Sequence, residues 1–121
     1  MGFFDYFSNH AESSERHALK ALQTHYYKHN YAQVKEALKA YANKHRYPIK
    51  SVDDKHGEVF IETSKFHMIA TIIEINPRET AIDIKTQTYK IVGFNKPKTI
   101  IIDTFKALDE VLTLKGVGLH P

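Results

Sequence analysis

The stretch FHMIATIIEI (residues 66–75), NPRE (76–79) and TAIDIKTQTY (80–89) decides the fold, because two strand-like runs surround a turn. Asn76 and Pro77 are typical turn residues, and the flanking runs are rich in β-branched side chains. The sequence therefore predicts a β-hairpin. Pairing Ile75 with Thr80 across the turn sets the register of the two strands.

This register divides the hairpin into two faces, because directly opposed residues point to the same side of a sheet. The predicted core face contains Ile69, Ile73, Ile75, Ile82 and Ile84. The second face contains Phe66, Met68 and Ile72 together with Asp83, Lys85 and Gln87. Since the second face is only half apolar, we expect Phe66, Met68 and Ile72 to contact a partner or a second subunit.

A helix is predicted over residues 31–45. Asn30 can cap its first turn, and Gln33 completes a capping-box pattern. Its apolar side chains recur at the helical period, at Val34, Ala37, Leu38, Tyr41 and His45.

Strands are predicted over residues 49–52 and 59–63, and the last strand of the central hairpin extends to about residue 92. A three-residue loop over 63–65 directs Val59 and Ile61 to the core, whereas a two-residue loop directs Phe60 there; we favour the longer loop. Residues 22–27 fit either a short helix or a first strand.

A second helix is predicted over about residues 97–115. Pro97 suits its first turn and Gly116 its C-terminal cap, with Lys115 in the last turn. Its apolar stripe consists of Ile101, Phe105, Leu108 and Leu112. Alternatively, residues 100–102 end a fifth strand, and Asp103 caps a shorter helix.

The predicted fold class is α+β, with a mainly antiparallel sheet of four or five strands and two helices packed on one face. Residues 1–12 are predicted to be an aromatic segment and linker, and residues 13–121 a single domain. A long C-terminal helix on an antiparallel sheet resembles helix-grip domains, and this resemblance implies a small apolar ligand under that helix. The opening MGFFDYF (1–7) and the polar linker after it are similar to small uncharacterised cytosolic proteins of Gram-positive bacteria.

Composition excludes several kinds of site. The 121 residues include no cysteine, so disulfides, thiolate metal sites and cysteine nucleophiles are absent. No apolar run reaches the 18 or more residues of a membrane span, and we expect a cytoplasmic protein. Phosphate-binding glycine loops, dinucleotide fingerprints and nucleophile elbows are also missing, so the sequence predicts neither a cofactor nor an enzyme.

Positive charge is concentrated in residues 1–48, which contain seven Lys and Arg residues against four Asp and Glu residues. Lys35, Lys39 and Arg46 form a basic stripe on the first helix. Such a stripe is typical of a solvated face, but it also suits contact with phosphate groups, so nucleic-acid binding is an alternative function.

Two histidine-containing groups have spacings that metals or acid–base chemistry use. His25 and His29 have the i, i+4 spacing of a helical metal pair, although no third ligand lies near them. A turn at residues 53–58 gathers Asp53, Asp54, His56 and Glu58. We favour surface or half-buried histidines in the first group and a solvated turn in the second.

The most favoured function is a non-catalytic domain that binds a partner or forms a homodimer through a face or edge of its sheet. Phe3, Phe4 and Phe7, together with Tyr6, form an aromatic cluster that water disfavours. We expect this segment to dock on its own domain or on a second subunit. Shallow insertion at a membrane surface and disorder are the alternatives.

Overall fold

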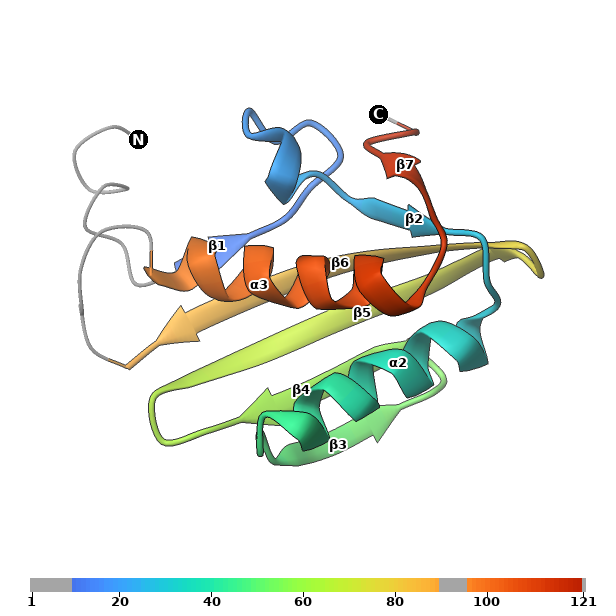
Figure 1. The fold of residues 1–121 in the computed structure, drawn as a ribbon. Helices are drawn as coiled ribbons and strands as arrows, with labels where there is room; N and C mark the ends of the chain where they lie inside the picture. Colours follow the sequence, from blue (N-terminus) through green and yellow to red (C-terminus); the bar gives the residue numbers. More distant parts are fainter. Residues whose placement is uncertain (1–9, 90–95, 121) are drawn as a thin grey trace.

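The computed structural model describes residues 10–89 and 96–120, and these residues form an α+β fold. Its strands form one sheet of seven strands, more than the four or five predicted from the sequence. The elements run in the order β1 (His10–Glu12), η1 (Lys20–Leu22), β2 (His25–Tyr27), α2 (Tyr31–Lys44), β3 (Ile49–Asp53), β4 (Glu58–Glu62), β5 (Phe66–Asn76), β6 (Glu79–Thr88), α3 (Lys96–Val111) and β7 (Leu114–Val117). Both helices lie on the same side of the sheet, as predicted (Figure 1).

Every pair of neighbouring strands is antiparallel, in the order β3-β4-β5-β6-β2-β7. β1 and β2 both pair with β6, one after the other along its length, so together they resemble one strand with an interruption. Residues 13–24 loop out between them, and we call this segment the 13–24 excursion. Backbone bonds between Ser14 and Leu22 and between Thr24 and Ser14, of 3.0 and 3.2 Å, close the base of this excursion. The predicted linker thus contains a strand, and residues 25–27 are also a strand.

The central hairpin has the predicted faces on β6 but the opposite faces on β5. Asn76 pairs with Glu79, which agrees with the predicted register, but an irregularity at Ile75 makes Glu74 pair with Thr80. One extra residue on one strand shifts every later pair and exchanges the faces of β5. The buried side of β5 is therefore Phe66, Met68, Ala70 and Ile72, and the predicted core placement of Ile69, Ile73 and Ile75 is wrong.

The first helix follows its prediction closely. In α2, Asn30 and Gln33 form the capping box, and Val34 and Leu38 are fully buried. The carboxylate of Glu74 also accepts the Tyr31 N–H at 2.7 Å, which anchors the helix start to β5.

The second helix is shorter than predicted. α3 includes residues 100–102, so these residues are not a strand, and it buries Ile101, Phe105 and Leu108 as predicted. It ends at Val111, and Lys115 and Gly116 lie in β7 rather than at a helix end. Residues 114–117 pair with the edge of β2 that β6 does not occupy. Because this strand pairing outweighs a weak local preference for helix, the helix ends before these residues.

The predicted three-residue loop after β4 is wrong, because Glu62 pairs with His67 and the Thr63 N–H donates to the Phe66 carbonyl at 2.8 Å, which leaves a two-residue loop. Val59 and Ile61 are nevertheless fully buried as expected, because the faces of β5 are exchanged as well. Gly57 has a φ of 69°, and a Cβ there would lie 2.1 Å from the carbonyl oxygen of Ile72. Only glycine fits this close approach of the turn to β5.

Candidate functional site: the outer face of the sheet

The face of the sheet opposite the helices, called the outer face here, consists of two unlike halves. Side chains alternate along a strand, so the residues between the core positions of β4, β5, β6 and β2 point to this face. We define the covered half as Tyr26, Glu79, Ala81 and Asp83. We define the open half as Phe60, His67, Ile69 and Ile73.

The covered half is shielded by segments that are far away in sequence. Tyr26 pairs with Ala81, and these residues are only 3% and 7% exposed. The Tyr26 ring meets the His120 ring edge-on at 5.1 Å, and its hydroxyl donates to Glu15. Glu15 also accepts the backbone N–H of His120 at 3.1 Å, so the excursion and the C-terminal residues meet over Tyr26.

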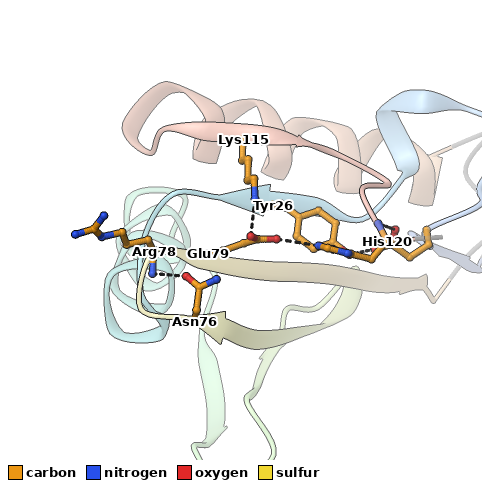
Figure 2. Close-up of polar contacts among 7 residues, drawn as sticks. Tyr26, Asn76, Arg78, Glu79, Lys115 and His120 are labelled. Carbon is orange, nitrogen blue, oxygen red and sulfur yellow. Dashed lines mark hydrogen bonds and ion pairs between the residues drawn. The ribbon is translucent and has the colours of Figure 1, made fainter.

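Glu79 anchors the C-terminal residues to β6. Figure 2 shows its carboxylate between Lys115 and His120, whose side-chain nitrogens lie 2.5 and 3.0 Å from the two oxygens. The Glu79 side chain is only 9% exposed. Hydrogen bonds from Lys115 and then His120 lower the pKa of this carboxyl below its ordinary value.

Asp83 anchors both ends of the 13–24 excursion. One of its carboxylate oxygens accepts the Ser13 hydroxyl at 2.6 Å and the Thr24 hydroxyl at 2.7 Å. The Ser13 hydroxyl also accepts the backbone N–H of Ile84 at 2.9 Å. The polar groups of the covered half are thus occupied by contacts within the chain, and no buried side-chain N or O atom among the described residues lacks a partner.

The open half carries apolar side chains that face solvent. Phe60 and Ile69 are directly opposed on β4 and β5 and are half-buried, while Ile73 is 57% exposed. The His67 ring lies 5.8 Å from both the Phe60 and Tyr89 rings, which extends the patch into a row of rings. Ile75, at the bulge, is 46% exposed.

His25 and His29, whose spacing also suits a helical metal pair, make different contacts, and His25 is more buried than the favoured interpretation expected. His25 is buried in β2, and its ring stacks on Phe105 at 3.6 Å. Burial lowers the pKa of His25, so its ring is neutral at pH 7. His29 accepts the Thr113 N–H at 2.9 Å. No group of three or more metal-ligating residues occurs among the described residues.

The acidic turn holds α2 against β3 and β4. Asp54 accepts the Tyr31 hydroxyl at 2.6 Å and the Lys35 ammonium at 3.1 Å, whereas Asp53 contacts His56 at 2.8 Å. These exposed contacts agree with the expected solvated turn.

The predicted basic stripe is largely compensated. Lys35 pairs with Asp54 at 3.1 Å, and Lys39 pairs with Glu36 at 3.5 Å. Arg46 lies beyond the end of α2, next to other elements. The structure therefore does not bring Lys35, Lys39 and Arg46 together as one uncompensated cationic surface.

The residues predicted to contact a partner are not at the surface. Phe66, Met68 and Ile72 are 6%, 0% and 2% exposed, so their predicted placement on an accessible face is wrong. The bulge at Ile75 is the cause, because it turns these side chains toward the helices. Phe3, Phe4 and Phe7 lie outside the described residues.

An open groove of about 670 Å³ lies beside α3, where the resemblance to helix-grip domains implies a ligand. It is lined by His25, Phe105, Leu114 and Val117, among others. The apolar stripe of α3 itself is packed, since Ile101 and Leu108 are fully buried. The groove therefore runs along one side of α3, next to Phe105, and not beneath Ile101 and Leu108.

Comparison with known proteins gives no assignment: no family model matches the chain, and no curated protein matches it. The resemblance to small proteins of Gram-positive bacteria stays an expectation. Among the described residues, no helix combines the length and apolar character needed to cross a membrane.

Proposed function

We propose that this protein is a non-catalytic domain that forms a homodimer through the open half of the outer face. The observation that carries the proposal is the exposure of Ile73, at 57%, on the same face of β5 as Ile69, which is opposed by Phe60, while the other half of this face is shielded by the same chain. Apolar side chains gathered on one exposed face mark interaction sites. The face is that of the sheet, as expected from the sequence, but its residues are different.

The surroundings of the patch favour a second copy as the partner. Ile69 is opposed by Lys85, and Phe60 lies between Glu58 and Glu62 along β4. An apolar centre with a polar rim of both signs is the usual anatomy of a protein interface. In a two-fold contact, the acidic side chains of one copy meet the lysines of the other.

The size of the patch sets the expected affinity. Strands β3 to β6 are about 4.8 Å apart, and seven residues of strand span about 24 Å, so the open half covers roughly 500 Å² in projection. This footprint is at the low end of specific interfaces. We expect a dimer with a dissociation constant in the micromolar range.

Sedimentation equilibrium from about 1 to 300 μM tests the proposal. The wild-type mass should rise from the 14.0 kDa of the monomer toward twice that value. Replacing both Ile69 and Ile73 with Thr keeps β-branched residues in the strand and removes the apolar contact, so the variant should stay monomeric.

Val111→Ser is the matched control, because Val111 is 69% exposed on α3, away from the outer face. This variant should dimerise like the wild type. A wild-type protein that remains at 14.0 kDa throughout, or a double variant that still dimerises, would contradict the proposal.

A further inference from the structure

A second groove lies on the helix side of the molecule, where the end of α2, the β4–β5 turn, the end of β6 and the start of α3 meet. Its volume is about 830 Å³, within the range of small-molecule sites. We call it the aromatic groove. Tyr47 and Phe66 form its apolar part, and Arg46, Lys65 and Lys96 contribute charge.

Tyr47 is at the centre of the apolar part. Its ring meets Phe66 edge-on at 5.2 Å and Tyr41 edge-on at 6.1 Å, and it lies nearly parallel to His45 at 5.5 Å. These contacts hold the ring in one orientation, although Tyr47 itself is only half-buried. A fixed, partly exposed ring is a surface on which another planar ring can stack.

The groove has an excess of positive charge. Arg46, Lys65 and Lys96 line it, and Asp103 is the carboxylate among its lining residues. Among the described residues, no carboxylate forms an ion pair with any of these three cations, in contrast to Lys35 and Lys39. Uncompensated cations in a concave site concentrate anions there.

Arg46 has a backbone conformation that normally requires glycine. Its φ is 58°, and it is the one non-glycine residue with positive φ in the described part of the chain. Its N–H donates to Asn43 at 3.1 Å and the next N–H, of Tyr47, donates to Ala42 at 2.8 Å, which is the pattern of a glycine-terminated helix. An arginine at such a position is a local strain of the kind that functional sites retain.

From these three features we infer that the aromatic groove binds a mononucleotide or a similar small molecule with a planar ring and a phosphate. The ring stacks on Tyr47, and Arg46, Lys65 and Lys96 hold the phosphate. This site lies on the other side of the sheet from the proposed dimer contact, because its apolar part belongs to the helix side, and Tyr89 borders both. It also differs from nucleic-acid binding along α2, since it uses neither Lys35 nor Lys39.

Isothermal titration calorimetry with AMP, adenosine and inorganic phosphate tests the inference on the full chain at low salt. AMP should bind at least tenfold more tightly than either adenosine or phosphate, because it alone presents both groups to the groove. Raising the salt concentration should weaken AMP binding, as expected for a contact with cations.

Arg46→Gly separates binding from folding. Glycine is the preferred residue at this φ, so the melting temperature should be unchanged or higher, while AMP affinity falls at least tenfold. Lys55→Gln is the control, because Lys55 is an exposed cation in the β3–β4 turn and should leave AMP affinity unchanged. The double variant Lys65→Gln/Lys96→Gln tests the same phosphate contact without changing Arg46.

Three results would overturn the inference. These are no heat with millimolar AMP, equal affinity for AMP and adenosine, or unchanged AMP affinity in both the Arg46 variant and the double variant. A single-stranded oligonucleotide that binds a hundredfold more tightly than AMP would also overturn it, in favour of a nucleic-acid surface.

Discussion

The covered and open halves of the outer face belong to the same strands but differ in their neighbours. Over the covered half, residues from the 13–24 excursion and from the C-terminal end satisfy Tyr26, Glu79 and Asp83. Over the open half, Ile73 remains 57% exposed. The difference teaches that a sheet face is closed by a few polar anchors that fix the covering segments, and that the half without such anchors is available to another molecule.

Removing one carboxylate from each half, an anchor in the covered half and an acid that anchors no segment in the open half, should give the largest contrast. Asp83→Ala deletes the acceptor of the Ser13 and Thr24 hydroxyls, so unfolding free energy should fall by about 1.5–3 kcal/mol. Glu58 is the matched acid in the open half. It lies level with Asp83 across the sheet, because Thr71 of β5 is paired with Glu58 on one side and with Asp83 on the other. Glu58→Ala should change stability by less than about 0.5 kcal/mol. Urea denaturation measures both, and equal losses would show that the two halves are energetically alike.

The pH dependence of stability should also differ between the halves. Lys115 and His120 lower the pKa of Glu79 in the folded protein, so its stabilising effect is complete above its unfolded value of 4.5. That effect is lost as pH falls through the lower folded pKa. Glu79→Gln should therefore lower the melting temperature at pH 7 but have little effect at the acidic end of the range.

Glu62 on the outer face is the matched acid, because Tyr89 and Lys50 lower its pKa as well. Its side chain is 38% exposed, compared with 9% for Glu79. Glu62→Gln should thus produce a smaller loss of melting temperature at pH 7, because solvent screens its contacts. Thermal melts in which the Glu62 variant loses more than the Glu79 variant would reverse the comparison.

Two tyrosines give the smallest predicted contrast. Tyr26→Phe removes the hydroxyl that donates to Glu15 from a residue that is 3% exposed, and should cost about 1 kcal/mol. Tyr89→Phe removes a hydroxyl that donates to Glu62 from a residue that is 45% exposed, and should cost less than about 0.5 kcal/mol. Chemical denaturation of the two variants in parallel checks the order, which fails if Tyr89→Phe is the more damaging change.

The sequence predicts the fold class, both helices and the faces of β6, because each depends on local periodicity. It does not predict the faces of β5, since isoleucine occupies both sides of that strand at Ile69, Ile72 and Ile73. The bulge at Ile75 determines which of the two sides of β5 is buried, and the residues on either side of it form hydrogen bonds with residues that are distant in the sequence. Glu74 accepts the Tyr31 N–H, and the Thr80 hydroxyl donates to the His29 carbonyl.

The covered half has no recognisable signal in the sequence. His120 and Glu15 are 105 positions apart, and Lys115 and Glu79 are 36 apart, so no short motif contains these pairs. β7 is missed for the same reason, because its pairing with β2 depends on an edge that only the folded sheet provides. The exposure of Ile73 likewise follows from the bulge and not from hydrophobicity.

The pairing of β2 with β7 has a consequence for the protein while it is being synthesised. β2 leaves the ribosome long before β7, since Tyr27 pairs with Leu114 across the whole helical and hairpin region. During this interval the nascent chain has an unpaired β2 edge, and Tyr26 and Glu79, which the C-terminal residues contact in the folded protein, are exposed to water. Unpaired edges are the positions at which incomplete chains associate wrongly. Translation that stalls after α3 should therefore yield a more aggregation-prone product than the finished chain.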